Sequence, residues 1–283
     1  MLTLNLVLEG GAMRGMFTAG VLDSLDEQNL IFDYVIGVSA GACMGVSYVT
    51  RQRGRSRNIN ISYCRDPRYF SYRNLLKEGN LFSVQFTYEE VPRRLIPFDY
   101  QAFEESPIHF VTAATDCETG QSVYLHNDRD MIQEIRASAS MPFFSKPVEI
   151  GGRFLLDGGA SDSIPVRHAM EEGHPKSVVI LTRPKGYRKK IKSNSLLYKI
   201  MLPKYPRLAE AMNNRPAVYN QQLDDIEILE KAGSCIAVYP PADIIVDRLE
   251  RDKEKLEALY QAGVRAGAEL GKKLPQFLLD NKS

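Results

Sequence analysis

The chain has 283 residues, of which 44% are hydrophobic. A chain of this length and composition buries a substantial core, which excludes intrinsic disorder and a small disulfide-stapled scaffold. The 36 basic residues nearly balance the 35 acidic residues, so the molecule lacks the overall positive field of a nucleic-acid-binding protein, and no nucleic-acid partner is expected.

The first fifty residues predict a strand, a helix, a second strand and a second helix. The apolar run 2–8 is typical of a strand buried on both faces, and apolar residues recur at helical spacing over 16–28. The second strand is expected at 32–38 and the second helix at 40–50. Because alternating strands and helices form right-handed crossovers, this order predicts a parallel sheet.

The rest of the chain is less uniform. Repeated prolines and glycines between 51 and 107 predict no regular element there. Strands are expected at 109–115, 122–125, 147–150, 153–156 and 177–182, and helices at 130–138 and 166–172. Gly151-Gly152 is a hairpin signal. After Arg183 the composition shifts, and helical periodicity dominates at 217–232 and 247–274.

Cysteines and histidines are scarce, with four of each. The cysteines have no C-x-x-C spacing and no nearby histidine in a ligand pattern, so we expect no zinc, no other metal and no cofactor. The apolar start of the chain lacks a basic n-region and is too short for a signal peptide, and no apolar run reaches the roughly 20 residues of a spanning helix. We expect a reduced, cytoplasmic, soluble chain.

The segment Gly37-Val-Ser39-Ala-Gly41 has the pattern G-x-S-x-G between a predicted strand and a predicted helix. In that setting the serine takes a strained backbone conformation with its hydroxyl projecting, and glycines flank it because side chains would collide. The helix that begins at Ala40 aims free N–H groups at charge developing on a substrate carbonyl. A glycine-rich turn with an incidental serine is the alternative.

A second glycine loop follows the first strand and contains Gly10, Gly11, Ala12, Arg14 and Gly15. It is not a dinucleotide fingerprint, because Ala12 occupies the middle glycine position, and it lacks the G-K-[ST] of a phosphate loop. Its amides are candidate oxyanion donors beside that of Ala40. Each such donor is typically worth about 3 kcal/mol of transition-state stabilisation.

A serine nucleophile needs a base. Asp157 ends an apolar strand and precedes Gly158-Gly159, and an apolar site would raise its pKa toward a useful value. An Asp-Gly turn without a catalytic role is the alternative. Ser39, Asp157 and His168 also satisfy the chain order of a Ser-Asp-His triad, although a solvated helix position is the more ordinary interpretation of His168.

Together, Gly10-Gly-Ala-Met-Arg-Gly15, Gly37-Val-Ser-Ala-Gly41 and Asp157-Gly-Gly159 resemble the patatin-like phospholipase family in order and spacing. The segment 137–147 is similar to a further part of that family. The resemblance covers about residues 4 to 183. It implies a three-layer α/β/α sandwich with a mostly parallel sheet, hydrolysis of acyl esters in phospholipids or related lipids, and a Ser-Asp dyad without histidine.

By position, the resemblance makes Ser39 the nucleophile and Asp157 the base, and it assigns the oxyanion loop to Gly10, Gly11, Ala12 and Arg14. Ala12 departs from the family's usual third glycine. The catalytic domain would span 1–184, and residues 185–283 resemble the mainly helical C-terminal extension of some bacterial members. A non-catalytic lipid-binding protein on the same fold is the alternative to an enzyme, and the oligomeric state does not follow from the sequence.

Basic residues are concentrated between 185 and 207, where no acidic residue occurs and leucine, isoleucine and methionine are interleaved. Such a segment is typical of peripheral contact with an anionic membrane. A solvated loop and helix packed on the core is the alternative. A second basic run contains Arg51, Arg53, Arg55 and Arg57.

Overall fold

The computed structural model describes residues 1–126 and 130–279. Within these residues the strands form one eight-stranded sheet in the order β5-β6-β3-β2-β1-β7-β8, with β4 also paired to β3. The strands are β1 (Leu2–Leu8), β2 (Phe32–Val38), β3 (His109–Asp116), β4 (Ser122–Leu125), β5 (Val148–Ile150), β6 (Arg153–Asp157), β7 (Ser177–Ile180) and β8 (Cys235–Val238). Pairing is parallel from β3 through β8 along this order and antiparallel where β4, β5 and β6 join, so the predicted mostly parallel sheet is confirmed.

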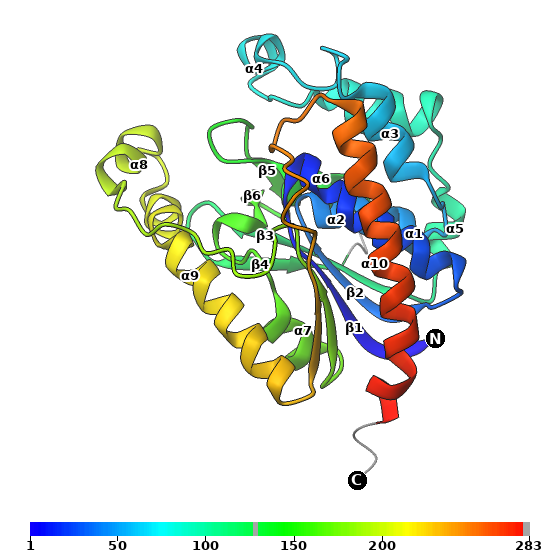
Figure 1. The fold of residues 1–283 in the computed structure, drawn as a ribbon. Coiled ribbons are helices and arrows are strands. Elements are labelled where there is room, and N and C mark those ends of the chain that lie inside the picture. Colours follow the sequence, from blue (N-terminus) through cyan, green and yellow to red (C-terminus); the bar gives the residue numbers. More distant parts are fainter. Residues whose placement is uncertain (127–129, 280–283) are drawn as a thin grey trace.

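Helices cover both faces of the sheet (Figure 1). Leu6 and Leu8 point to one face, where they join a core with α1 (Gly15–Glu27), α2 (Ala40–Val49) and α10 (Lys253–Leu279). Val7 points to the other face and packs with α7 (Val166–Glu172) and α9 (Pro206–Lys231). Because successive side chains of a strand alternate between faces, the apolar run of β1 supplies both cores. The α/β/α sandwich is therefore confirmed.

The C-terminal region is part of this layered body. β8 adds a parallel strand beside β7, and α10 packs along α1, on the side of the sheet opposite α9 (Figure 1). The mainly helical character expected for this region is confirmed by α8 (Ser195–Met201), α9 and α10. The boundary at residue 184, with a second unit at 185–283, stays a prediction.

The segment between α2 and β3, for which no element was predicted, is mostly helical. It forms α3 (Arg55–Tyr63), α4 (Tyr72–Glu78), the π-helical segment η2 (Gln85–Leu95) and α5 (Tyr100–Glu104). Short length and the proline inside η2 hide these helices from periodicity. α6 (Met131–Ala139) and the 3₁₀ segments η1 (Ala12–Arg14) and η3 (Gly158–Ala160) complete the fold.

Two C-terminal helices differ from their predicted bounds. α9 begins at Pro206, eleven residues before the predicted start at 217, and it continues through Pro216. α10 begins at Lys253 instead of 247, because the carboxylate of Asp252 accepts hydrogen bonds from the amides of Glu254 and Lys255 and so caps the helix.

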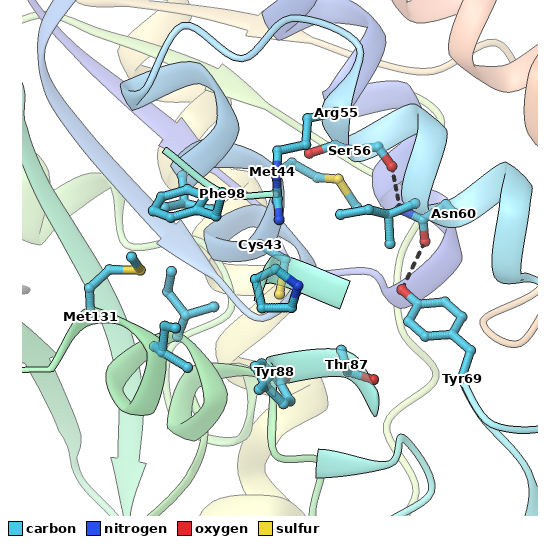
Figure 2. Close-up of a pocket in the computed structure, with 15 residues that line it drawn as sticks. Cys43, Met44, Arg55, Ser56, Asn60, Tyr69, Thr87, Tyr88, Phe98 and Met131 are labelled. Carbon is cyan, nitrogen blue, oxygen red and sulfur yellow. Dashed lines mark hydrogen bonds between the residues drawn. The ribbon is translucent and has the colours of Figure 1, made fainter. Parts of the chain in front are cut away.

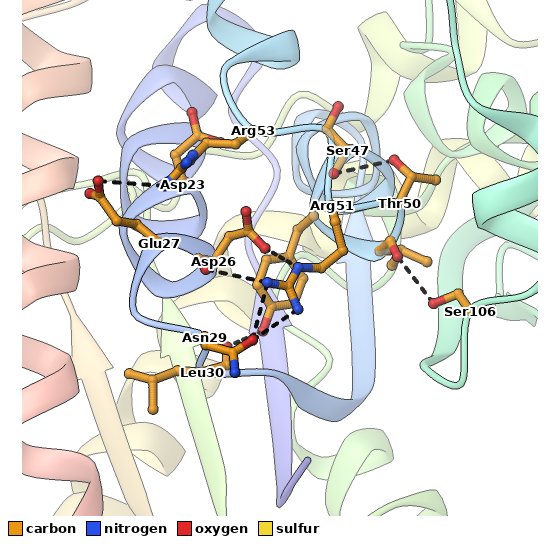
Figure 3. A network of polar contacts seen from close by, with 12 residues as sticks. Asp23, Asp26, Glu27, Asn29, Leu30, Ser47, Thr50, Arg51, Arg53 and Ser106 are labelled. Carbon is orange, nitrogen blue, oxygen red and sulfur yellow. Dashed lines mark hydrogen bonds and ion pairs between the residues drawn. The ribbon is translucent and has the colours of Figure 1, made fainter.

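The basic run after α2 is used inside the fold. Arg51 pairs with Asp26 and donates to the Asn29 side chain at 3.2 Å, which ties the end of α2 to the end of α1 (Figure 3). Arg57 pairs with Glu257 at 2.7 Å and so joins α3 to α10. Arg51 and Arg57 therefore form intramolecular ion pairs that join helices, although both side chains remain partly exposed.

Candidate active site

Ser39 lies at the sharp turn between β2 and α2. Its backbone has φ 55° and ψ −118°, a combination that L-residues other than glycine adopt only at a cost. A Cβ at Gly37 would lie 2.5 Å from the Ala42 nitrogen, and one at Gly41 would lie 2.3 Å from the Leu8 carbonyl oxygen. The glycines of the G-x-S-x-G segment are thus needed for close backbone approach around a strained serine.

The first glycine loop lies beside this turn because β1 and β2 are paired in parallel, with Leu8 opposite Gly37. A Cβ at Gly10 would lie 3.0 Å from the Cβ of Ser39. Ala12 has φ 50°, so its backbone lies in the left-handed region, which costs a residue with a Cβ about 1–2 kcal/mol. The glycine loop and the G-x-S-x-G turn are therefore in direct contact.

Asp157 ends β6, on the opposite side of β3 from β2. Its carboxylate accepts a hydrogen bond from the Gly159 amide at 2.8 Å, and only 7% of the residue is exposed. Burial raises the pKa of Asp157, and the Ser39 hydroxyl and the charge of Arg215 oppose that shift. Ser39 and Asp157 are far apart in the sequence. The folded sheet brings them together, because they follow or end strands on either side of β3.

A cavity of about 420 Å³ opens at these residues. Among the predicted site residues it is lined by Gly10, Gly11, Ala12, Arg14, Ser39, Asp157 and Gly159. Gly15, Gly37, Gly41 and Gly158 stand behind this surface: a Cβ at Gly15 would meet Ala40, and one at Gly158 would meet the Ala113 carbonyl. Some of the predicted site residues therefore line the cavity, and the others pack against the backbone behind it.

The cavity also has lining residues that no sequence motif indicates. They include Arg183, Lys189, Tyr219, Arg215 and Arg248, all from the part of the chain after β7. Lys189 was counted only as one of a run of basic residues. Nothing in the spacing of the others marks them, because they come from three separate segments.

Two smaller cavities continue from Ser39 into the apolar core. The first, of about 70 Å³, is lined by Ser39, Cys43 and Tyr88 among others, and the second, of about 120 Å³, shares Cys43 and Tyr88 with it. Figure 2 shows the second, with Phe98 and Met131 on its walls. Burial raises the pKa of the Cys43 thiol to about 12, so this thiol is neutral, whereas Arg55 brings a charged side chain to the second cavity. Together the two cavities form a mostly apolar path that starts at the serine.

His168 lies elsewhere. It stacks on Tyr124 with 3.4 Å between ring centres, and its Nε2 is 3.0 Å from Glu172. It is not among the residues that line the cavities around Ser39. The Ser-Asp-His order along the chain therefore does not correspond to a cluster in space.

Glu172 also lies near His109 and His126. The ligand-type atoms of these three exposed residues lie within 4.8 Å of one another, so they could hold a metal ion. They belong to three different elements or loops, which is why no spacing pattern revealed them. This cluster and His168 share Glu172, and neither faces Ser39.

Helix α8 borders the cavity and also faces outward. Leu197, Tyr198 and Met201 line the cavity, whereas Leu196 and Ile200 are 72% and 67% exposed. Of the basic residues around it, Arg188 pairs with Asp224 at 2.7 Å. Among the described residues, no helix combines the length and the apolar character that crossing a bilayer requires.

Known proteins resemble this chain over different shares of its length. Uncharacterized protein YjjU of Escherichia coli K12 is 33% identical over 184 residues, which are 63% of this chain and 52% of that protein. Human patatin-like phospholipase domain-containing protein 6 is 24% identical over 99% of this chain and 22% of its own length. The chain thus spans about half of the first relative and less than a quarter of the second.

Among solved structures, VipD of Legionella pneumophila aligns with a TM-score of 0.46 and 11% identity over 95% of this chain and 67% of that one, a likeness too weak to bear on function. Two family models match the sequence. "Domain of unknown function (DUF6363)" matches residues 205–279, and "Patatin-like phospholipase" matches residues 6–170, more than half of the chain. The chain therefore belongs to the patatin-like phospholipase family.

Proposed function

We propose that this protein is a lipid acyl hydrolase, a carboxylic ester hydrolase that uses Ser39 as nucleophile and Asp157 as general base. The observation that carries the proposal is the meeting of a strained, cavity-facing serine and a buried carboxyl group with a raised pKa at one cavity. Family membership supports the substrate class. No histidine takes part.

In the first half of the reaction, the Ser39 oxygen attacks the ester carbonyl carbon while Asp157 accepts the serine proton. The carbonyl oxygen becomes an oxyanion, which the amides of Gly11, Ala12 and Ala40 stabilise, each donor typically contributing about 3 kcal/mol. Collapse of this intermediate breaks the bond to the alcohol, which leaves with the proton from Asp157. The products are the free alcohol and an acyl group on Ser39.

In the second half, Asp157 accepts a proton from water, and the resulting hydroxide equivalent attacks the acyl carbon. The ester bond to Ser39 breaks, the proton returns to the serine oxygen, and a fatty acid leaves. A carboxyl group can act in both directions here only if its pKa lies closer to neutrality than that of an exposed aspartate. The burial of Asp157 has that effect.

The apolar path behind Ser39 supports an acyl chain as the bound group. The two cavities lead from the serine past Cys43 into the core, and burial of each methylene of an acyl chain contributes about 0.8 kcal/mol. We propose that the chain of the acyl group occupies this path while the alcohol half lies in the larger cavity.

We also propose peripheral membrane contact through residues 185–207. Leu196 and Ile200 of α8 are exposed beside a cavity that the same helix lines, so a bilayer under α8 would lie at the entrance of the site. Flotation with anionic vesicles tests this. Leu196→Asp is expected to reduce binding at least fivefold, whereas Ile228→Asp, at an exposed position of α9, keeps it; equal effects would contradict the proposal.

The catalytic proposal is tested by fluorophosphonate labelling and by turnover of lysophospholipid and neutral glyceride esters. Ser39→Ala should lose labelling and turnover, and Asp157→Asn should lose turnover. His168→Ala is the matched control and should keep both. Loss of activity in His168→Ala with retention in Asp157→Asn would restore the triad, and vesicle binding without turnover of any ester would favour a non-catalytic lipid-binding protein.

A further inference from the structure

Positive charge is concentrated in the cavity beside Ser39. The basic side chains that line it are Arg14, Arg183, Lys189, Arg215 and Arg248, and the four arginines carry the charge. Among the same lining residues, carboxylates come from Glu9 and Asp157 alone. The cavity therefore has an excess of positive charge although the whole chain is close to neutral.

Glu9 favours the charged form of Arg14, and Asp157 that of Arg248, but neither carboxylate pairs with a basic side chain of the cavity within residues 1–126 and 130–279. No ion pair among the described residues involves any of the five. Lys189 lies over the ring of Tyr219 at 3.6 Å, and Arg183 lies over the ring of Tyr187 at 4.5 Å. The Nε of Arg215 is buried with no hydrogen-bond partner among the described residues. A buried, unpaired guanidinium donor calls for an acceptor that the protein itself does not supply.

The carboxylates of the cavity are already engaged. Glu9 accepts hydrogen bonds from the Thr182 amide at 2.6 Å and from the Tyr219 hydroxyl at 2.9 Å. Asp157 accepts from Gly159 and interacts with Ser39. Neither forms an ion pair with Arg215 or Arg248 within the described residues, so the arginines remain available to an anion that enters the cavity.

The basic groups of this cavity also lower one another's pKa by mutual repulsion. Burial, and then the charge of Arg215, lowers the pKa of Lys189 to about 6. Burial, and then Arg183, lowers the pKa of Arg14 to about 10, and Arg248 is affected in the same direction by burial, Arg215 and Arg183. A bound anion reverses the repulsive part of these effects, since an opposite charge favours each protonated form.

We propose that this cluster, the cation subsite, binds the phosphoryl group of an anionic acyl-ester lipid while the ester carbonyl lies at Ser39. The inference rests on the lipid acyl hydrolase function proposed above and adds the chemistry of the head group. A guanidinium fork matches the geometry of phosphate oxygens, and a short glycerol backbone joins phosphate to ester. A choline head group would add a cation to a positive cavity, so phosphomonoester lipids are preferred over choline lipids.

Two arginines of the cation subsite come from the C-terminal region. Arg215 lies on α9, and Arg248 lies between β8 and α10, both within residues 205–279. The carbonyl of Arg248 accepts a hydrogen bond from the Met13 amide at 3.2 Å, which fixes this segment to the glycine loop. The match to the patatin-like phospholipase model ends at residue 170. The region after it thus supplies two of the arginines that we propose bind the head group.

The test compares three substrates with one acyl chain: 1-oleoyl lysophosphatidate, the corresponding lysophosphatidylcholine and monooleoylglycerol, presented to the full chain in the same neutral detergent. Arg215→Gln and Arg248→Gln should each reduce kcat/KM for lysophosphatidate at least tenfold more than for monooleoylglycerol. Arg215→Lys should recover part of that difference. Arg265→Gln, at an exposed position of α10 that lines none of the cavities described above, is the matched control and should change no ratio.

Equal losses for the phosphorylated and neutral lipids, or a wild-type preference for the choline lipid, would overturn the cation subsite. If wild type turns over none of the three esters, the proposed function fails, and a binding measurement still tests the subsite. Calorimetric titration of Ser39→Ala with glycerol 3-phosphate should show binding that weakens at least tenfold in Ser39→Ala/Arg215→Gln. Binding of inorganic phosphate without any lipid preference would indicate a free phosphate site and contradict the head-group assignment.

Discussion

The backbone amide of Ser39 donates a hydrogen bond to the hydroxyl of Ser138 at 2.9 Å, and that hydroxyl donates in turn to the carbonyl of Ala113 at 2.6 Å. Ser138 lies on α6 and is fully buried. The strained turn between β2 and α2 is thus held from outside, through a side chain nearly one hundred residues further along the chain.

Ser138→Ala should therefore reduce kcat at least tenfold with little change in KM, because it frees the amide that fixes the serine. Leaving a buried donor unpaired costs about 1–3 kcal/mol, so thermal unfolding should also occur earlier. Ser24→Ala on α1, another buried serine that accepts a hydrogen bond, is the control and should affect stability alone. Unchanged kcat in Ser138→Ala would show that the turn holds itself.

Backbone strain at Ser39 predicts that two inactive variants differ in stability. Ser39→Ala and Ser39→Gly should both be inactive, but glycine adopts φ 55° without the penalty that alanine keeps. Denaturant unfolding should find Ser39→Gly more stable than Ser39→Ala by about 1–2 kcal/mol. Equal stabilities would mean that the turn is relaxed in solution.

Asp157 predicts a pH dependence. Burial raises the pKa of this carboxyl group, so the folded state binds its proton more tightly than the unfolded state. The penalty for the buried charge applies in full above the folded-state pKa, shrinks as the pH falls below that value, and is gone below the unfolded-state pKa. Asp157→Asn should therefore raise Tm at neutral pH, by about 2–4 °C per kcal/mol recovered, while turnover is lost.

The same shift should appear in the pH profile of wild type. Because Asp157 must be ionised to accept a proton, kcat/KM should fall on the acid side at a pH above the ordinary range of an aspartate. The profile of His168→Ala should keep this limb. An acid limb near pH 4, or one that vanishes in His168→Ala, would contradict the role of Asp157.

Cys43 lies where the two apolar cavities meet. Cys43→Phe should close the path, so that the ratio of kcat/KM for a palmitoyl ester to that for a butyryl ester falls at least tenfold. Cys43→Ser keeps the volume and is the control. Paired p-nitrophenyl esters give the measurement, and a ratio unaffected by the phenylalanine would place the acyl chain elsewhere.

Helices α1 and α10 cross with almost no space between them. A Cβ at Gly263 would lie 2.1 Å from the Phe17 carbonyl oxygen. Gly263→Val should destabilise the chain by about 2–3 kcal/mol through overpacking, whereas Arg265→Val, at an exposed position of α10, should cost far less.

A single unfolding transition is expected in denaturant, and two transitions would instead support independent units divided at residue 184.

The sequence determined the elements that have a local signal. Apolar runs, the glycine loop and the G-x-S-x-G turn predicted β1, α1, β2 and α2 almost to the residue, and with Asp157-Gly-Gly159 they led to the family that the model match confirms. These features need only neighbouring residues, since strand period, helix period and turn geometry are local. The roles of Ser39 and Asp157 stay predictions.

The tertiary structure decided which distant groups share a cavity. Glycines spaced by four at 263, 267 and 271 indicate a close helix contact in retrospect, but no pattern names α1 as the partner. Nothing in the sequence around Arg183, Arg215 and Arg248 distinguishes them from arginines on the protein surface, yet they line the cavity. The sequence also does not show that Arg51 and Arg57 form ion pairs with Asp26 and Glu257. Because charge acts through space and not along the sequence, only the tertiary structure could show that Arg183, Arg215 and Arg248 meet at the cavity of Ser39.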